Sequence, residues 1–305
     1  MSRINVVLWG LKKKRDSFRF ISQGFYDSLT RQGIDVRWVD DKTKYGSVVD
    51  KNSLVIGVNV AGNNIPIVEG SKYVTLNIED QSEIGRRLAQ TGNWYKIQEF
   101  TNRSIGTKDS LGSVVVYNSD KKTLYMPWGA PHAKNSFLEP VLNSDISQNE
   151  YWVGAIWNDA LNQGNRESID TYKTILRKQG IAFKRLGGSR LKLNGLSESD
   201  NAFKVRASRL GAGVVGNWQK NNQYYPCRLF KAVSFGVPPT SNLNAVSIFK
   251  DSLLHSNDIE EMTELALAES MSSRIERTKL GQKLIEKYTY EESFSRIIRM
   301  VNDDW

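Results

Sequence analysis

The stretch YYPCRLFKAVSFGVP, residues 224–238, carries the most specific pattern in the chain. Pro226 precedes an apolar-periodic segment that ends in a glycine, which predicts a helix over 228–235. Arg228 and Lys231 are three residues apart and therefore share one face of that helix. Backbone N–H groups and two cations at one helix start predict a site for an anion. The alternative is a surface helix whose cations simply extend into solvent.

A second basic residue stands in an equivalent place. Arg166 follows the polar loop 158–165 and begins the predicted helix 167–179. Open α/β sheets bind their ligands beyond the carboxyl ends of the strands, where such loops lie. We therefore expect Arg166 and Arg228 to converge on the same phosphates from two separate helix starts.

Aromatic residues precede the helix at 228–235. Trp218, Tyr224 and Tyr225 are suited to stack on a nucleobase or a sugar ring. Packing in the core is the alternative, and we expect it for at least one of them.

Outward from this region, strand patterns alternate with helix patterns, which predicts parallel βαβ units. The first series has strands at 4–9, 36–39, 54–60 and 73–78 and helices at 18–32 and 81–90. A second series has strands at 152–157, 181–186 and 212–216 and helices at 167–179, 199–210 and 228–235. Residues 136–149 lose periodicity and form an interdomain linker. The fold class is therefore α/β, with an N-terminal lobe at 1–140, a C-terminal lobe at 150–285, and a helix at 286–305 that packs back on the first lobe.

Composition excludes several classes of protein. The length of 305 residues exceeds what one core usually serves. A single cysteine and two histidines exclude a disulfide framework and a Cys/His zinc cluster. No apolar run is long enough to span a membrane and no signal peptide pattern is present, so a cytoplasmic protein is expected. A literal G-x-G-x-x-G at 211–216 is discounted as a dinucleotide motif, because its strand runs through the glycines instead of preceding them.

The charge balance indicates an anionic partner. Lys and Arg number 42 against 33 Asp and Glu, for a net charge of +9. Nucleic acid, nucleotide phosphates and anionic lipid headgroups all fit this charge. The one dense block, Lys12 to Arg15, is either a solvated loop or a docking patch for an anionic membrane surface or glycan.

Residues 228–238 resemble the signature helix of the GT-B glycosyltransferases, which bind a nucleotide sugar in their C-terminal lobe. In that family a basic residue contacts the donor diphosphate, and a residue three positions later faces the ribose. Residues 154–168 and the surroundings of Arg228 are also similar to those of the phage DNA β-glucosyltransferases and of bacterial surface-glycan glycosyltransferases. The resemblance implies two Rossmann-like lobes facing a central cleft.

The resemblance also implies roles for particular residues. Arg166 and Arg228 would hold the donor pyrophosphate. Trp218 and Tyr225 remain donor-binding candidates through stacking alone. The family places its ribose-binding glutamate where this chain has Lys231, so the donor nucleotide is held differently or Lys231 contacts a phosphate. The catalytic base of the phage enzymes falls on Glu79.

The position of Glu79 directly after a predicted strand also makes it a candidate for the catalytic base. An inverting transfer needs a carboxylate within about 3 Å of the acceptor hydroxyl to take its proton. Glu79 and Asp80 follow the strand at 73–78 and are the best placed, although capping of the next helix is the alternative, for Asp80 above all. His132 is a second candidate for the base.

No acidic D-x-D motif follows a strand, so we expect no metal and no cofactor beyond the nucleotide-sugar substrate. The cations of the chain would balance the leaving diphosphate. The leading function is transfer from a nucleotide sugar to a glycan or lipid-linked glycan, in the cytoplasm or at the membrane periphery. One alternative is transfer to modified DNA bases. The other is a non-catalytic nucleotide- or polyanion-binding protein, a possibility that Lys231 keeps open.

Overall fold

The chain divides into two compact units, each with its own sheet. Unit 1 comprises Met1–Glu99, Val115–Pro127 and Tyr290–Trp305, and unit 2 comprises Phe100–Val114 and Trp128–Thr289. The computed structural model describes residues 5–10, 12, 17–39, 48–57, 65–76, 78, 80–98, 115–127, 129–130, 136–158, 164–186 and 196–303.

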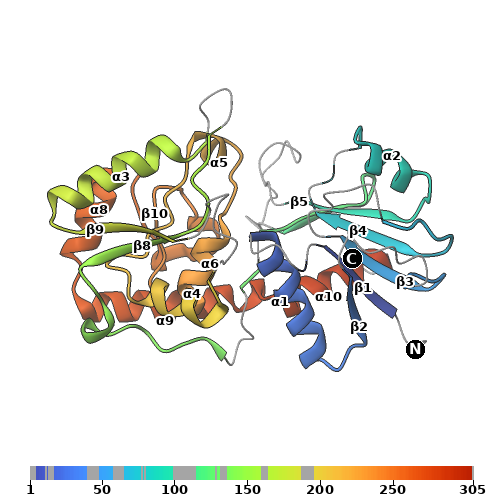
Figure 1. Ribbon diagram of the computed structural model, residues 1–305, viewed down its shortest axis with the longest axis horizontal. Helices are drawn as coiled ribbons and strands as arrows, with labels where there is room; N and C mark the ends of the chain where they lie inside the picture. The colour runs from blue at the N-terminus through green and yellow to red at the C-terminus, as the bar shows by residue number, and fades with distance from the viewer. Residues whose placement is uncertain are drawn as a thin grey trace. The chain divides into compact units, whose positions relative to one another are not determined.

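Unit 1 contains a seven-stranded sheet of order β2-β1-β3-β4-β5-β7-β6, in which only the β6–β7 pair is antiparallel (Figure 1). Its strands are β1 (Asn5–Trp9), β2 (Val36–Val39), β3 (Ser53–Gly57), β4 (Lys72–Leu76), β5 (Trp94–Gln98), β6 (Val116–Asn118) and β7 (Thr123–Tyr125). Its helices are α1 (Ser17–Arg31), α2 (Glu83–Ala89) and α10 (Tyr290–Val301). The parallel order confirms the alternation of strands and helices predicted for this region.

Helices cover both faces of this sheet, which explains the nearly continuous apolar strands. Trp9 and Tyr73 pack against Leu88 of α2 in one buried cluster. Helices α1 and α10 lie side by side (Figure 1), with the rings of Phe25 and Tyr290 centred 5.0 Å apart. A Cβ on Gly24 would lie 2.2 Å from the Tyr290 ring, so this close helix contact requires glycine.

Unit 2 contains two parallel strand pairs. They are β8 (Asn149–Val153) with β9 (Ala182–Leu186), and β10 (Thr240–Ser241) with β11 (Leu254–His255). Residues 211–216 connect the pairs without forming a regular strand, so the strand predicted there is wrong. Gly213 donates its N–H to Thr240, but the Asn242 side chain accepts from the Val215 N–H and donates to its carbonyl. A side-chain amide therefore replaces a strand partner.

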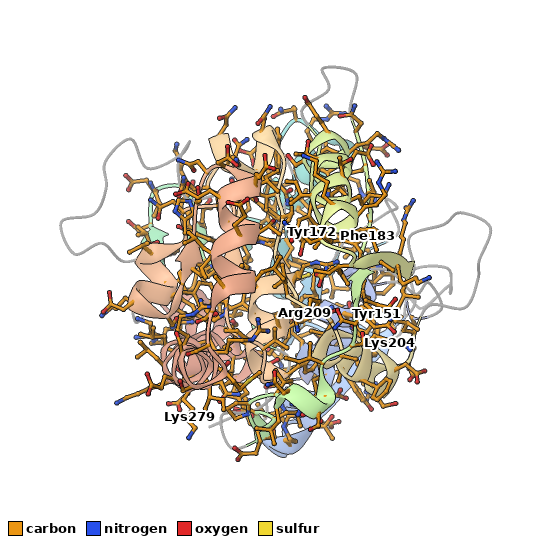
Figure 2. All side chains as sticks on the ribbon, turned by 90° about the vertical axis from the view of Figure 1, so that its left-hand side faces the viewer. Tyr151, Tyr172, Phe183, Lys204, Arg209 and Lys279 are labelled. Atoms are coloured by element: carbon orange, nitrogen blue, oxygen red, sulfur yellow. The ribbon has the colours of Figure 1, made fainter. Side chains whose placement is uncertain are left out.

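The helices of unit 2 enclose these strands from both sides. They are α3 (Arg166–Lys178), α4 (Glu198–Arg206), α5 (Asn217–Asn221), α6 (Cys227–Ser234), α7 (Val246–Phe249), α8 (Ile259–Ala268) and α9 (Met271–Ile285), with 3₁₀ turns at Asn143–Asp145, Lys250–Ser252 and Glu286–Tyr288. Tyr172 of α3 packs with Phe183 of β9, whereas Tyr151 of β8 lies beneath the Lys204 ammonium of α4 (Figure 2). Within the described ranges, no helix combines the length and the apolarity needed to cross a bilayer.

One predicted strand begins and ends too late. The strand expected at 152–157 is β8, which already ends at Val153. The backbone turns at Gly154, whose φ is +155°, and Asn165 then holds Ala155 and Trp157 by side-chain hydrogen bonds. The polar residues Asn149 and Glu150 concealed the true start of the strand, because a buried acid breaks the apolar pattern.

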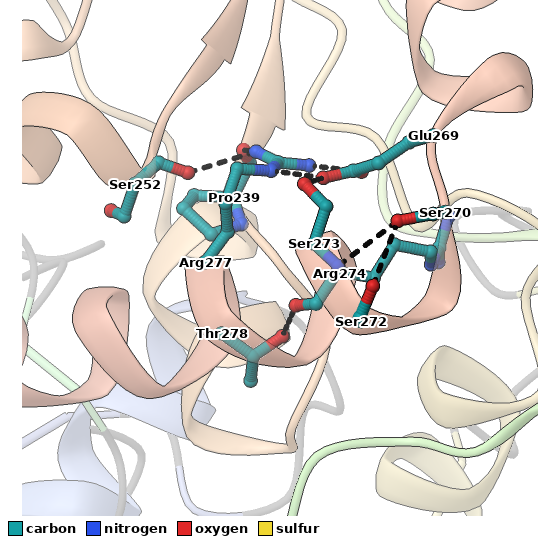
Figure 3. Close-up of polar contacts among 9 residues, drawn as sticks. All are labelled: Pro239, Ser252, Glu269, Ser270, Ser272, Ser273, Arg274, Arg277 and Thr278. Atoms are coloured by element: carbon teal, nitrogen blue, oxygen red, sulfur yellow. Dashed lines mark hydrogen bonds and ion pairs between the residues drawn. The ribbon is translucent and has the colours of Figure 1, made fainter.

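A paired arginine anchors α9 to the rest of unit 2 (Figure 3). Arg277 donates from Nε and Nη2 to the two carboxylate oxygens of Glu269, at 2.6 and 2.7 Å. Its Nη1 donates to the carbonyls of Pro239 and Ser252, both at 2.8 Å. Burial alone would raise the pKa of Glu269, but the hydrogen bonds and charge of Arg277 outweigh it and the pKa is lowered.

We expect Arg277→Met to destabilise the protein by about 3–5 kcal/mol, because it leaves the Glu269 carboxylate buried without its partner. The free energy of unfolding from urea titration measures this loss. Lys173→Met is the matched control, since Lys173 and Asp170 pair at 2.9 Å with side chains 44% and 55% exposed. An exposed pair contributes little, so an equal loss in the control would contradict the assignment.

Candidate functional site

Arg228 lies in the first turn of α6 and reaches the carboxyl end of β8. Its guanidinium carbon is 3.5 Å from the centre of the Trp152 ring, and its Nη2 donates to the Val153 carbonyl. The residue keeps some exposed surface, but burial of the guanidinium lowers the pKa of Arg228 to about 10, against the attraction of Glu150. The group therefore stays charged at neutral pH, and a cation is held at the end of a strand.

Gly154 permits this approach. A Cβ at Gly154 would lie 3.1 Å from Arg228 Nη2, and its positive φ is one that residues with side chains rarely adopt. The carboxyl end of a parallel strand is where open α/β sheets bind ligands. The guanidinium thus lies in the region where the sequence predicts an anion-binding site.

A buried acid accompanies the cation. Glu150 is 0% exposed, and its Oε2 accepts from the N–H groups of Leu210 at 2.9 Å and Gly211 at 3.2 Å. Burial raises the pKa of Glu150, opposed by these two hydrogen bonds and by the charge of Arg228. Sequence reasoning missed this residue. The available signal was its spacing from Trp152, because residues two apart on a strand share a face.

The loop before α3 is tightly packed. Asn165 is 5% exposed, with Oδ1 accepting from the Trp157 N–H at 2.9 Å and Nδ2 donating to the Ala155 carbonyl at 3.2 Å. A Cβ on Gly216 would lie 2.0 Å from the Gly164 carbonyl oxygen. Gly216, the last glycine of the discounted G-x-G-x-x-G motif, therefore serves close packing between this loop and the start of α5.

Arg166 and Arg228 have different surroundings. Arg166 is the exposed first residue of α3, and it lines an open groove of about 660 Å³ together with Asn158 and Glu167. Its backbone N–H donates to the Trp157 carbonyl at 3.2 Å. Arg228 is enclosed against Trp152 instead. Their convergence on one diphosphate stays a prediction.

The other donor-site candidates occupy distinct environments. Lys231 is half-buried, one turn after Arg228. Trp218 is half-buried in α5. The centre of its ring is 6.2 Å from the ring centre of Trp157 and 5.8 Å from that of Tyr224.

Tyr225 is a core residue. It is 3% exposed, and its hydroxyl shares a hydrogen bond of 2.9 Å with Ser247. It therefore fills the packing role that the sequence left open for at least one of these aromatics.

In unit 1, both carboxylate oxygens of Asp80 accept from Lys96 Nζ, at 2.8 and 3.2 Å. Helix α2 is capped by Ser82, whose Oγ accepts from the Gly85 N–H at 3.0 Å. The alternative that Asp80 caps this helix is therefore wrong, because the helix begins at Glu83. The other two candidates for the base, Glu79 and His132, lie outside the described residues.

Comparison with known proteins finds similarity in structure but not in sequence. No family model and no curated sequence matches the chain. An alpha-glucosyltransferase (AGT) in complex with UDP is 12% identical, with a TM-score of 0.62 over 97% of this chain and 100% of that one. An alpha-glucosyltransferase with UDP and a 13-mer DNA containing an HMU base is 12% identical, with a TM-score of 0.59 over 99% and 100%. OtsA in its apo form is 10% identical, with a TM-score of 0.53 over 98% and 99%.

These neighbours are GT-B proteins, and they match the chain over nearly its whole length. The predicted fold class, α/β with two Rossmann-like lobes of the GT-B type, is thereby confirmed.

Glu150 predicts a pH-dependent stability. Burial raises the pKa of Glu150 in the folded protein above the ordinary 4.5. The parent protein therefore loses stability as the pH rises above 4.5 and Glu150 ionises, and it has no such loss at lower pH. Glu150→Gln keeps an oxygen for the N–H groups of Leu210 and Gly211 but carries no charge. We expect its melting temperature, relative to the parent, to rise from about pH 4 to about pH 7.5.

Glu269→Gln is the control of opposite sign. Because the pKa of Glu269 is lowered, its ionised form contributes stability above pH 4.5 that disappears as the pH falls. This variant should lose stability relative to the parent as the pH rises. Parallel pH profiles for the two variants would contradict the assignment.

Proposed function

We propose that the protein is a glycosyltransferase that binds a UDP-sugar in unit 2 and transfers the sugar to an acceptor. The enclosed guanidinium of Arg228 at the carboxyl end of β8 is the observation that carries this proposal. A prepositioned cation lowers the energy of the charge that develops on a leaving diphosphate, with little reorganisation. The UDP bound in the AGT structure supports uridine as the nucleoside of the donor.

The N-terminus of α6 adds to the positive electrostatic potential of Arg228. The first N–H groups of a helix have no partner within it, and the N-cap Pro226 has no side-chain capping bond. The helix begins at Cys227, so these N–H groups and the Arg228 side chain belong to one turn. A phosphate here would meet both the helix terminus and the guanidinium.

For the acceptor we propose a modified base in DNA. The net charge of +9 suits a polyanion, and an alpha-glucosyltransferase of similar structure is bound to DNA containing an HMU base. This reverses the order expected from the sequence, in which a glycan came first. A glycan or lipid-linked glycan acceptor remains the competing outcome of the test.

We assign the general base to Glu79 and expect transfer without a metal. Asp80 follows it directly, but its carboxylate is engaged by Lys96, which leaves Glu79 as the acid for the acceptor proton. Arg228, with Arg166 and Lys231 as further candidates, would supply the positive charge that a metal supplies elsewhere.

Arg228→Met should weaken UDP binding about 10- to 100-fold, because hydrogen bonds to a charged phosphate are lost while the side-chain stem still covers Trp152. Calorimetric titration with UDP measures the change. Arg177→Met removes the same charge from the exposed last turn of α3 and should bind UDP like the parent. Equal losses in both variants would indicate a general charge effect in place of a specific site.

Transfer from UDP-glucose to a duplex carrying an HMU base should be detectable and unaffected by EDTA. Glu79→Ala should slow it about 100- to 10,000-fold with UDP binding unchanged, whereas Asp80→Ala should retain most activity. Duplex binding should weaken with salt, by a log–log slope of about 0.9 for each phosphate neutralised. If a lipopolysaccharide-type oligosaccharide is glucosylated and the duplex is neither bound nor modified, the acceptor assignment is wrong.

A further inference from the structure

Trp152 carries a buried hydrogen-bond donor that the protein does not use. The residue is 3% exposed, and its Nε1 has no hydrogen-bond partner in the described part of the chain. A buried N–H without a partner costs stability. Packing needs the ring but not the N–H, because the indole contacts both the Phe183 ring, with ring centres 6.3 Å apart, and the Arg228 guanidinium.

The unused N–H borders the space beside Gly154. A Cβ built there would lie 3.8 Å from Trp152 Nε1 and 3.1 Å from Arg228 Nη2. Apart from Gly154 and its chain neighbours, no other described atom comes within 4 Å of that point. Because Gly154 has no side chain, two nitrogen donors lie close to its backbone on the same side, at the end of β8.

The stacking of the two groups suits them to act together. The guanidinium carbon is 3.5 Å from the centre of the indole ring, so the cation lies over the face of the ring. The indole N–H lies in the plane of the indole ring, and the guanidinium N–H bonds lie in the plane of the guanidinium. Both therefore point outward from the edge of their group. Within the described residues, Arg228 donates one hydrogen bond, to Val153, and so keeps further N–H groups for a ligand.

We propose that Trp152 Nε1 and Arg228 form a two-donor subsite beside Gly154 for a non-bridging phosphate oxygen of the donor diphosphate. This rests on the proposed binding of a nucleotide sugar in unit 2. An anionic oxygen outside the Gly154 backbone, within hydrogen-bonding distance of both nitrogens, would satisfy the orphaned indole N–H and make a charge-assisted bond with the guanidinium. Glu150, on the same strand face, uses its Oε2 to accept hydrogen bonds from the N–H groups of Leu210 and Gly211.

Trp152→Phe keeps an aromatic ring under the guanidinium and removes only the N–H donor. We expect UDP and inorganic pyrophosphate to bind about tenfold more weakly, and uridine, which has no phosphate, to bind as it does to the parent. Phe183→Leu is the matched control, because it disturbs the ring packing of the same indole without removing its N–H. It should leave the ratio of UDP to uridine affinity unchanged.

The unaltered protein offers a direct observation of the same donor. The indole N–H resonance that disappears in Trp152→Phe identifies Trp152 in the nitrogen–proton correlation spectrum. Adding UDP or pyrophosphate should move it downfield, and adding uridine should not. If UDP binds and neither this resonance nor the affinity of Trp152→Phe changes, the subsite is wrong while nucleotide binding stands.

The probes also separate this inference from the proposed function. Binding of pyrophosphate with the Trp152 response, but none of UDP, would support the subsite and contradict the glycosyltransferase proposal. Absence of binding by both probes would overturn the two together. A matching loss for UDP and uridine in Trp152→Phe would assign Trp152 a packing role and overturn the subsite.

Discussion

The enclosure of one arginine side chain organises unit 2 at the carboxyl end of β8. A guanidinium can leave bulk water only where its charge and its donors are compensated. In this protein the Trp152 ring face, the Val153 carbonyl and the nearby Glu150 carboxylate supply that compensation from a single strand, while α6 supplies Arg228. The constraint determines where β8 ends, because a side chain at Gly154 would occupy the space beside the cation.

The comparison of two partly buried arginines indicates which one is structural. Arg277 directs four hydrogen bonds to both oxygens of Glu269 and to two backbone carbonyls, so four of its five N–H donors are used within unit 2 (Figure 3). Arg228 has one protein hydrogen bond within the described ranges and lies beside the unpartnered indole N–H of Trp152. Unmet hydrogen-bonding capacity around a cation is typical of a binding site, since structural ion pairs are normally satisfied.

Unit 1 contributes a scaffold of a different kind. Its parallel sheet buries apolar residues on both faces, and the last helix of the chain, α10, completes the layer beside α1. Asp80, which follows β4, pairs with Lys96 of β5. The carboxylate of Asp80 is therefore committed to an ion pair between neighbouring segments of the sheet.

Local patterns were enough to predict most helices and the parallel βαβ order, because amphipathic periodicity, a proline before α6 and glycines after helices act within a few residues. They also located Arg166 and Arg228 at two helix starts. Tertiary structure alone decided that Arg228 is enclosed against Trp152, that Tyr225 belongs to the core, and that Asn242 replaces a strand partner for residues 211–216. The spacing of Glu150 from Trp152 places both residues on one strand face, but the contacts of Glu150 with Leu210 and of Arg228 with β8 join segments about 60 to 75 residues apart, which no local periodicity records.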